Sequence, residues 1–155
     1  MKVLTILFLT GLLAACSGGQ RSLLQVQLCF ANAEDMAHFV EVMRSVSESN
    51  HMQYRDRSAV TRKELATLQQ SPGYSVLNVS AHDAAGVGWA GGNLGLSAYE
   101  VSIGFTEGTN PAAGHAFAED VIRRLSSRWA VYKVPSNRGA LPRCRKQAPM
   151  SATGR

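Results

Sequence analysis

Apolar and polar residues alternate along several short stretches of the chain, a pattern typical of strands that bury one face. The clearest stretch is 24–30, in which every second residue is apolar and Cys29 falls among the polar positions. The alternation recurs, less regularly in places, in four other stretches: 52–57, 74–82, 96–105 and 129–134. The pattern therefore predicts five strands, and it places Cys29 on the face of the first strand that points away from the core.

Two longer stretches repeat apolar residues every three or four positions, which predicts amphipathic helices. The first follows Asn32, a residue type that caps helices, and fades near residue 50. The second follows Asn110 and Pro111, a cap and a proline at the first helical position. A third, short helix is predicted after Thr61, because Thr61 and Glu64 have the spacing of a capping box.

The order of these elements predicts the fold class. Two amphipathic helices can cover one face of a mainly antiparallel sheet, which gives a two-layer α+β domain. The element order also resembles that of a ferredoxin-like fold with a helical insertion near residues 58–73. The resemblance implies the fold alone, since many functions share that architecture.

The stretch 84–95 holds five glycines around Trp89, and we expect it to be a loop. Within it, 86–91 matches the dinucleotide fingerprint G-x-G-x-x-G, but a strand follows where that fingerprint needs a helix. An exposed tryptophan supplies a large contact area to a partner. We therefore expect a partner-binding loop made by four residues: Gly88, Trp89, Gly91 and Asn93.

The first 16 residues have the form of an export signal. Lys2 precedes an apolar run that ends in Leu13-Ala14-Ala15-Cys16, and the run is shorter than the roughly 20 residues that span a bilayer. This end resembles the lipobox of the bacterial lipoprotein-precursor family. The resemblance implies cleavage before Cys16, lipid on its thiol and acylation of its new amino group. Ser17 in place of Asp implies, in a Gram-negative envelope, the outer membrane.

This interpretation divides the chain into four parts. They are a signal peptide at 1–15, a lipidated tether at 16–22, a single α+β domain at 23–146 and a disordered tail at 147–155. We expect the domain to face the periplasm close to its membrane, because the tether is short. A transmembrane anchor and a soluble secreted form are the alternatives.

The cysteines fit an exported protein. With Cys16 taken by the lipobox, Cys29 and Cys144 remain as a pair in a compartment where disulfides persist. We therefore expect a disulfide between Cys29 and Cys144. It would hold the segment that follows the last strand across the uncovered face of the sheet.

Charge is distributed unevenly along the chain. Residues 21–122 hold six basic and 11 acidic residues, whereas nine basic residues and no acidic one follow Ile122. The basic end, with Arg143 and Arg145, can bind an acidic partner or a negative membrane surface, or it can be a solvated tail. Nucleic acid is not expected as a partner in the envelope.

Three pairs of residues have the chemistry of acid–base catalysis or metal binding: His38 with Glu41, His82 with Asp83, and His115 with Glu119. Two ligands do not make a metal site, and no third can be assigned to any pair. Serine-hydrolase and metalloprotease motifs are missing from the sequence as well. We therefore expect neither catalysis nor a metal or cofactor.

These features predict a small lipoprotein that binds and occludes a protein partner in the periplasm. The class that fits best is an inhibitor or immunity protein against a toxic enzyme delivered to the envelope. The alternative is a structural lipoprotein of a secretion or pilus assembly, and an enzyme or small-ligand carrier is a third hypothesis. No motif separates these classes.

Overall fold

The computed structural model describes residues 22–135, which form three helices and six strands. The elements are β1 (Ser22–Cys29), α1 (Ala33–Ser49), β2 (Gln53–Asp56), α2 (Ser58–Thr67), β3 (Asn78–His82), β4 (Val87–Gly92), β5 (Glu100–Glu107), α3 (Pro111–Ser126) and β6 (Val131–Val134).

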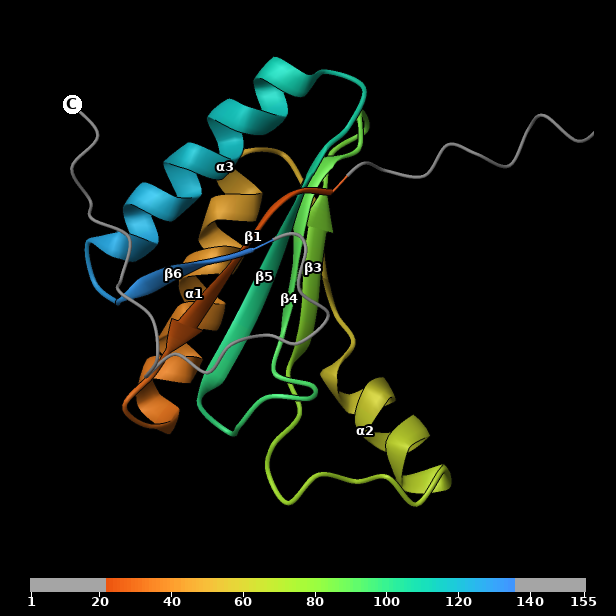
Figure 1. The fold of residues 1–155 in the computed structure, drawn as a ribbon. Helices are drawn as coiled ribbons and strands as arrows, with labels where there is room; N and C mark the ends of the chain where they lie inside the picture. Colours follow the sequence, from red (N-terminus) through yellow and green to blue (C-terminus); the bar gives the residue numbers. More distant parts are fainter. Residues whose placement is uncertain (1–21, 136–155) are drawn as a thin grey trace, which may run out of the picture.

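The six strands form one antiparallel sheet in the order β2-β3-β4-β5-β1-β6. Figure 1 shows α1 and α3 on one face of the sheet, with α2 standing off at one end. β1 lies between β5 and β6, so it splits the unit β5-α3-β6 as in a ferredoxin-like fold. The predicted two-layer α+β fold is therefore confirmed.

The core lies between the sheet and the two long helices. Val26 and Leu28 of β1 are fully buried there beside Ile103 of β5, because successive strand residues point to opposite faces and the alternation selects one of them. The helices contribute their apolar stripes, which include Phe39 and Met43 of α1 and Val121 and Leu125 of α3. The periodicity of the sequence thus predicted which residues pack together.

The predicted asparagine caps of the two long helices are confirmed. The side chain of Asn32 accepts a hydrogen bond from the backbone N–H of Asp35 at 3.0 Å, and that of Asn110 accepts one from Ala113 at 3.1 Å. The predicted capping box at Thr61 is wrong, because α2 begins three residues earlier. Thr61 instead lies inside α2, where its hydroxyl accepts a hydrogen bond from Asn78 at 2.8 Å and joins the helix to β3.

The loop predicted over residues 84–95 is also wrong, because β4 occupies its centre and pairs with β3 and β5. The glycines allow a close approach between strands. A Cβ atom on Gly88 would lie 2.3 Å from the Ala81 carbonyl oxygen, and one on Gly92 would lie 2.6 Å from that of Leu77. Glycine here therefore permits strand packing, although glycine runs favour loops in general.

Strand register defines two ends of the sheet. Ser22, where β1 begins, pairs with Thr106, and the turn between β3 and β4 lies at this same end. Cys29, where β1 ends, pairs with Glu100 at the opposite end. We call the Ser22 end proximal, since the predicted tether precedes it. We call the other end distal: it carries α2, the connection 68–77 and the β4–β5 connection 93–99 (Figure 1).

Candidate functional site

Trp89 was expected to project from a loop, and this expectation is wrong. Its side chain is only 2% exposed and packs in the core from β4. The indole Nε1 donates a hydrogen bond to the Ser47 hydroxyl of α1 at 3.1 Å, and that hydroxyl donates to the Met43 carbonyl at 2.7 Å. Trp89 therefore joins the helical layer to the sheet and is not available to a partner.

The other three residues of the expected loop also belong to the framework. Gly88 and Gly91 are buried within β4. Asn93 is fully buried: its Oδ1 accepts from the Leu77 N–H and its Nδ2 donates to the Ser75 carbonyl, both at 2.8 Å. Asn93 thereby holds the segment that precedes β3 against the segment that follows β4. The four residues expected to bind a partner thus stabilise the fold instead.

The acid–base candidates do not converge on one site. His38 Nδ1 lies 3.6 Å from Glu41 Oε2 on the exposed side of α1. Asp83 is engaged in a turn, since its Oδ1 accepts from the N–H groups of Ala85 and Val87. Among residues 22–135, no three metal-ligating side chains come together.

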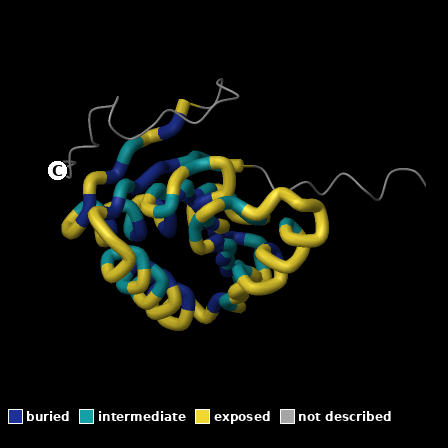
Figure 2. Tube along the Cα trace, turned by 90° about the horizontal axis from the view of Figure 1, so that it is seen from below, coloured by how far each residue is buried: buried dark blue, intermediate teal, exposed yellow. Residues whose placement is uncertain are grey.

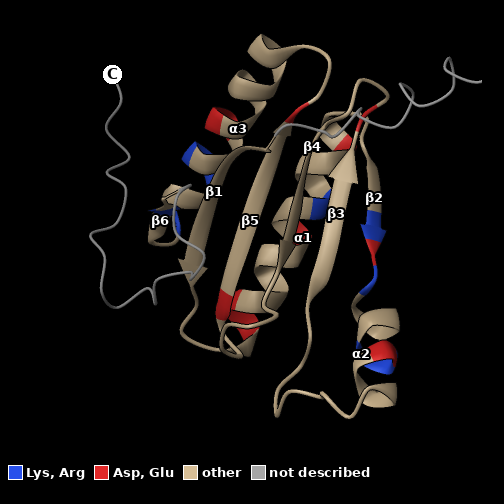
Figure 3. Ribbon diagram, turned by 45° about the vertical axis from the view of Figure 1, so that its right-hand side comes forward, with Lys and Arg blue, Asp and Glu red and all other residues tan. Residues whose placement is uncertain are grey.

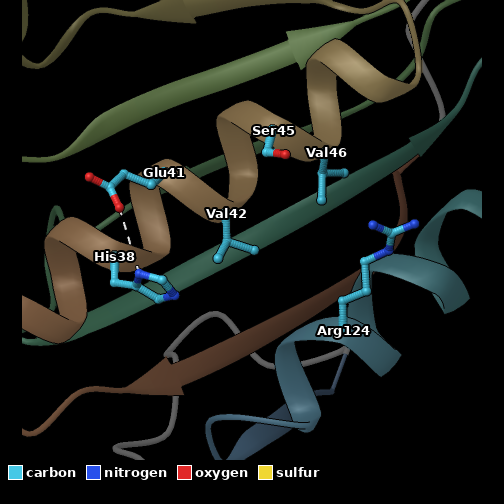
Figure 4. A pocket seen from close by; sticks show the side chains of 6 residues that line it. All are labelled: His38, Glu41, Val42, Ser45, Val46 and Arg124. Carbon is cyan, nitrogen blue, oxygen red and sulfur yellow. Dashed lines mark ion pairs between the residues drawn. The ribbon is translucent and has the colours of Figure 1, made fainter.

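A shallow groove of about 300 Å³ lies between α1 and α3. Figure 4 shows His38 and Glu41 along one side of it and Arg124 reaching in from α3, with Val42 and Val46 between them. Arg124 is already paired, because its Nε donates to Asp120 Oδ2 at 2.7 Å. The charges that line this groove are therefore largely satisfied by neighbours within the same helix.

The distal end carries every large hydrophobic side chain that is well exposed in the described part of the chain. Val60 of α2 is 49% exposed, and Leu68, directly after α2, is 64% exposed. Leu94 and Tyr99, both in the β4–β5 connection, are each 43% exposed. Figure 2, seen from this side, shows mostly exposed chain where α2 lies.

Leu94 and Tyr99 of the β4–β5 connection are held on an ordered base. The Tyr74 hydroxyl donates to the carbonyls of Asn93 and Leu96, at 3.1 and 3.2 Å, so the two distal connections are joined. Sequence reasoning missed this end because Val60 and Leu68 belong to no apolar stripe. The signal in the sequence that could have found them is the lack of an apolar stripe in this predicted helix, since such a helix has no face to bury; in the structure, Thr61 is its only buried residue.

Cys29 lies on the sheet face away from α1 and α3 and is disulfide-bonded. Cys16, Cys144, Arg143 and Arg145 lie outside the described residues, so the predicted lipid site, the pairing with Cys144 and the two arginines stay predictions. Gln27, also on this face, is 1% exposed, and its Nε2 has no hydrogen-bond partner within residues 22–135.

Comparison with known proteins yields no relative. No family model, no curated protein and no solved structure matches the chain. Within residues 22–135, no helix has the length and apolar character needed to cross a bilayer.

Proposed function

We propose that this protein is a lipid-anchored envelope protein that binds and occludes a protein partner through its distal end. The observation that supports the proposal is the collection of four exposed large hydrophobic side chains at that end: Val60, Leu68, Leu94 and Tyr99. Exposed apolar surface of this kind marks interaction sites when it gathers in one region.

The direction of β1 places these four residues away from the predicted lipid anchor. β1 has eight residues, so its ends are separated by about 23 Å at roughly 3.3 Å per residue. A chain anchored just before Ser22 then holds its distal end away from the membrane, where a soluble partner can reach it. Of the binding classes expected from the sequence, an inhibitor or immunity protein fits this arrangement best, because it must meet its target away from the bilayer.

The test uses a photo-crosslinking residue in place of Leu68 or of Leu94, in cells that make the full chain. We expect a discrete adduct with one partner protein from both positions. Ala84 is the matched control, since it is exposed at the proximal end. Equal adducts from Ala84, or none from either distal position, would contradict the proposal.

Two further arms define the function. Leu68→Asp should weaken the complex by about 2 kcal/mol if Leu68 is an anchor, and loss of a partner enzyme's activity on stoichiometric binding would identify an inhibitor. An adduct with an envelope assembly, with no enzyme activity blocked, would favour the structural alternative.

The lipid anchor has its own test. Cys16→Ser should release the domain from membranes and abolish palmitate labelling. A variant that stays membrane-bound and labelled would contradict the lipid anchor.

A further inference from the structure

The sheet ends in two edge strands, β2 and β6, and these differ in exposure. β6 buries two of its four residues, Val131 and Val134. β2 buries none of its four residues, and three of them are exposed. Figure 3 shows β2 at its edge of the sheet with no described helix or strand on its outer side. An uncovered edge strand of this kind can pair with a further strand.

The register of β2 shows which of its backbone groups point outward. The N–H of Arg57, directly after β2, donates to the Asn78 carbonyl of β3 at 2.8 Å. Along an antiparallel strand, alternate residues turn both their N–H and C=O groups toward the same neighbour. Arg55 therefore faces β3 as well, whereas Tyr54 and Asp56 direct theirs away from the sheet. Within residues 22–135, these outward N–H and C=O groups have no backbone partner.

Two arginines beside these groups have no carboxylate within 4.0 Å in the described part of the chain. Arg55 is exposed on β2, and the guanidinium of Arg44, exposed on α1, lies over the Tyr54 ring 5.2 Å from its centre. By contrast, Arg57 lies 3.7 Å from Glu64. Successive strand residues point to opposite faces, so Arg55 lies on the face away from α1. The two unpaired cations thus flank the β2 edge from opposite faces of the sheet.

We propose that an extended acidic segment of a protein partner adds to the sheet as a further strand beside β2. Its main chain pairs with the outward groups of Tyr54 and Asp56, a mode in which backbone bonds give affinity and alternate side chains give specificity. Two consecutive acidic residues in the segment point to opposite faces, so one carboxylate meets Arg55 and the other meets Arg44. The carboxylate of Asp56 is engaged in the turn into α2, where its Oδ1 accepts from the Ser58 N–H at 2.9 Å.

A second copy of this chain fits the same edge poorly. The antiparallel pairing of two β2 strands that uses all of the outward groups sets Tyr54 of each copy opposite Asp56 of the other. Arg55 then lies directly opposite Arg55 of the second copy, with Cβ atoms about 5 Å apart, and like charges in that position destabilise a strand pair. The edge therefore favours a different, acidic chain over self-pairing.

This inference rests on the proposed function, because β2 ends at the distal end and leads into α2. Val60, one of the four exposed hydrophobic residues there, is the third residue of that helix. A segment paired with β2 therefore continues toward surface that we assign to the partner. The strand edge adds to that assignment the chemistry of the partner: an extended, acidic stretch of chain.

Strand addition is tested with a capped octapeptide, Thr-Val-Thr-Glu-Glu-Val-Thr-Val, on the full chain. We expect the peptide to slow hydrogen exchange of the Tyr54 and Asp56 amides at least about tenfold, because both become hydrogen-bonded. The same peptide with N-methyl groups on its central amides keeps its charge and loses its donors, so it should give no protection. No protection by the unmethylated peptide at millimolar concentration, or equal protection by both peptides, overturns strand addition.

The acidic preference is tested with charge reversals. Arg55→Glu should weaken peptide binding at least about fivefold, and a Lys-Lys centre in the peptide should weaken binding to the parent chain similarly. Lys133→Glu is the matched control, because Lys133 is an exposed cation on β6, at the opposite edge. Equal weakening by both substitutions overturns recognition at β2. Protection of Tyr54 and Asp56 in a chain that dimerises without peptide overturns the choice of a different protein.

These outcomes separate the inference from the proposed function. If crosslinking at Leu68 and Leu94 finds no partner while the peptide protects Tyr54 and Asp56, the proposed function fails and strand addition stands. If a crosslinked partner is found but the Tyr54 and Asp56 amides exchange freely in its complex, the proposed function stands and strand addition is wrong.

Discussion

At the scale of single residues, the contact between Trp89 and Ser47 sets how the two layers fit together. Ser47 is fully buried in α1, and its hydroxyl both donates to Met43 and accepts from the indole of Trp89. A buried polar group must be paired, so each partner here depends on the other. The aromatic residue that seemed suited to recognition is therefore structural.

Removing the Ser47 hydroxyl should test that dependence. Ser47→Ala leaves the buried Trp89 N–H unpaired, which costs about 1–3 kcal/mol of unfolding free energy. Trp89→Phe removes the donor and leaves the Ser47 hydroxyl bonded to Met43. Urea unfolding of both variants and of the double variant should give a coupling energy of about 0.5–1.5 kcal/mol. Strictly additive changes in unfolding free energy would show that the Trp89–Ser47 hydrogen bond does not stabilise the fold.

Tyr54 gives a second prediction, on pH. Burial, with a smaller contribution from Asp56, raises the pKa of Tyr54 above its ordinary value, and Arg44, whose guanidinium lies over the ring 5.2 Å from its centre, offsets part of that rise. Unfolded Tyr54 ionises above about pH 10, whereas the folded side chain keeps its proton longer. Stability from this residue is thus present below pH 10 and declines as the pH rises through the higher folded value.

Tyr54→Phe should flatten that decline, because phenylalanine does not ionise. The variant should have about the stability of the parent chain at pH 7, because the Tyr54 hydroxyl is uncharged there in both the folded and the unfolded chain. Urea unfolding of both chains from pH 7 to pH 11 measures the difference. Parallel curves for the two chains above pH 10 would show that another group controls the alkaline loss.

At the scale of elements, α2 differs from the two other helices. α1 and α3 each bury an apolar stripe, whereas α2 buries Thr61 alone and has no side-chain bond at its N-terminal cap, Arg57. Its hydrogen bonds to the sheet all involve Asn78: the backbone N–H donates to Ser58, the side chain donates to Thr61, and the carbonyl accepts from the N–H of the cap residue Arg57. Little packing therefore holds α2 in place.

We expect the amides of α2 to exchange with solvent at a lower opening free energy than those of α1 and α3, since local stability follows buried contacts. Thr61→Val should lower that energy further, because it keeps the shape of the side chain and removes the acceptor for Asn78. Hydrogen exchange followed by mass spectrometry measures all three helices together. Equal protection of the three helices would show that α2 is as firmly held as α1 and α3 and would contradict the prediction.

At the scale of the whole molecule, the proximal and distal ends have different roles in the proposed function. The proximal end receives the predicted tether, and the distal end carries the exposed apolar residues. This division follows from strand direction, because β1, β2 and β4 end at the distal end and β3 and β5 begin there, and not from any local motif. A partner that docks on the β4–β5 connection would meet a surface held by Tyr74 and Asn93, whereas α2 is attached to the sheet through Asn78.

The sequence by itself determined the two-layer fold, both long helices and their asparagine caps, because period, capping and apolar alternation are local properties. Only the tertiary structure decided the role of the glycine-rich stretch. Its glycines and Trp89 look like a loop along the chain, but β3 and β5 supply hydrogen bonds on both sides and α1 supplies a partner for the indole. Exposure of Val60 and Leu68 was likewise decided by packing, since a helix buries a side chain only where another element lies against it.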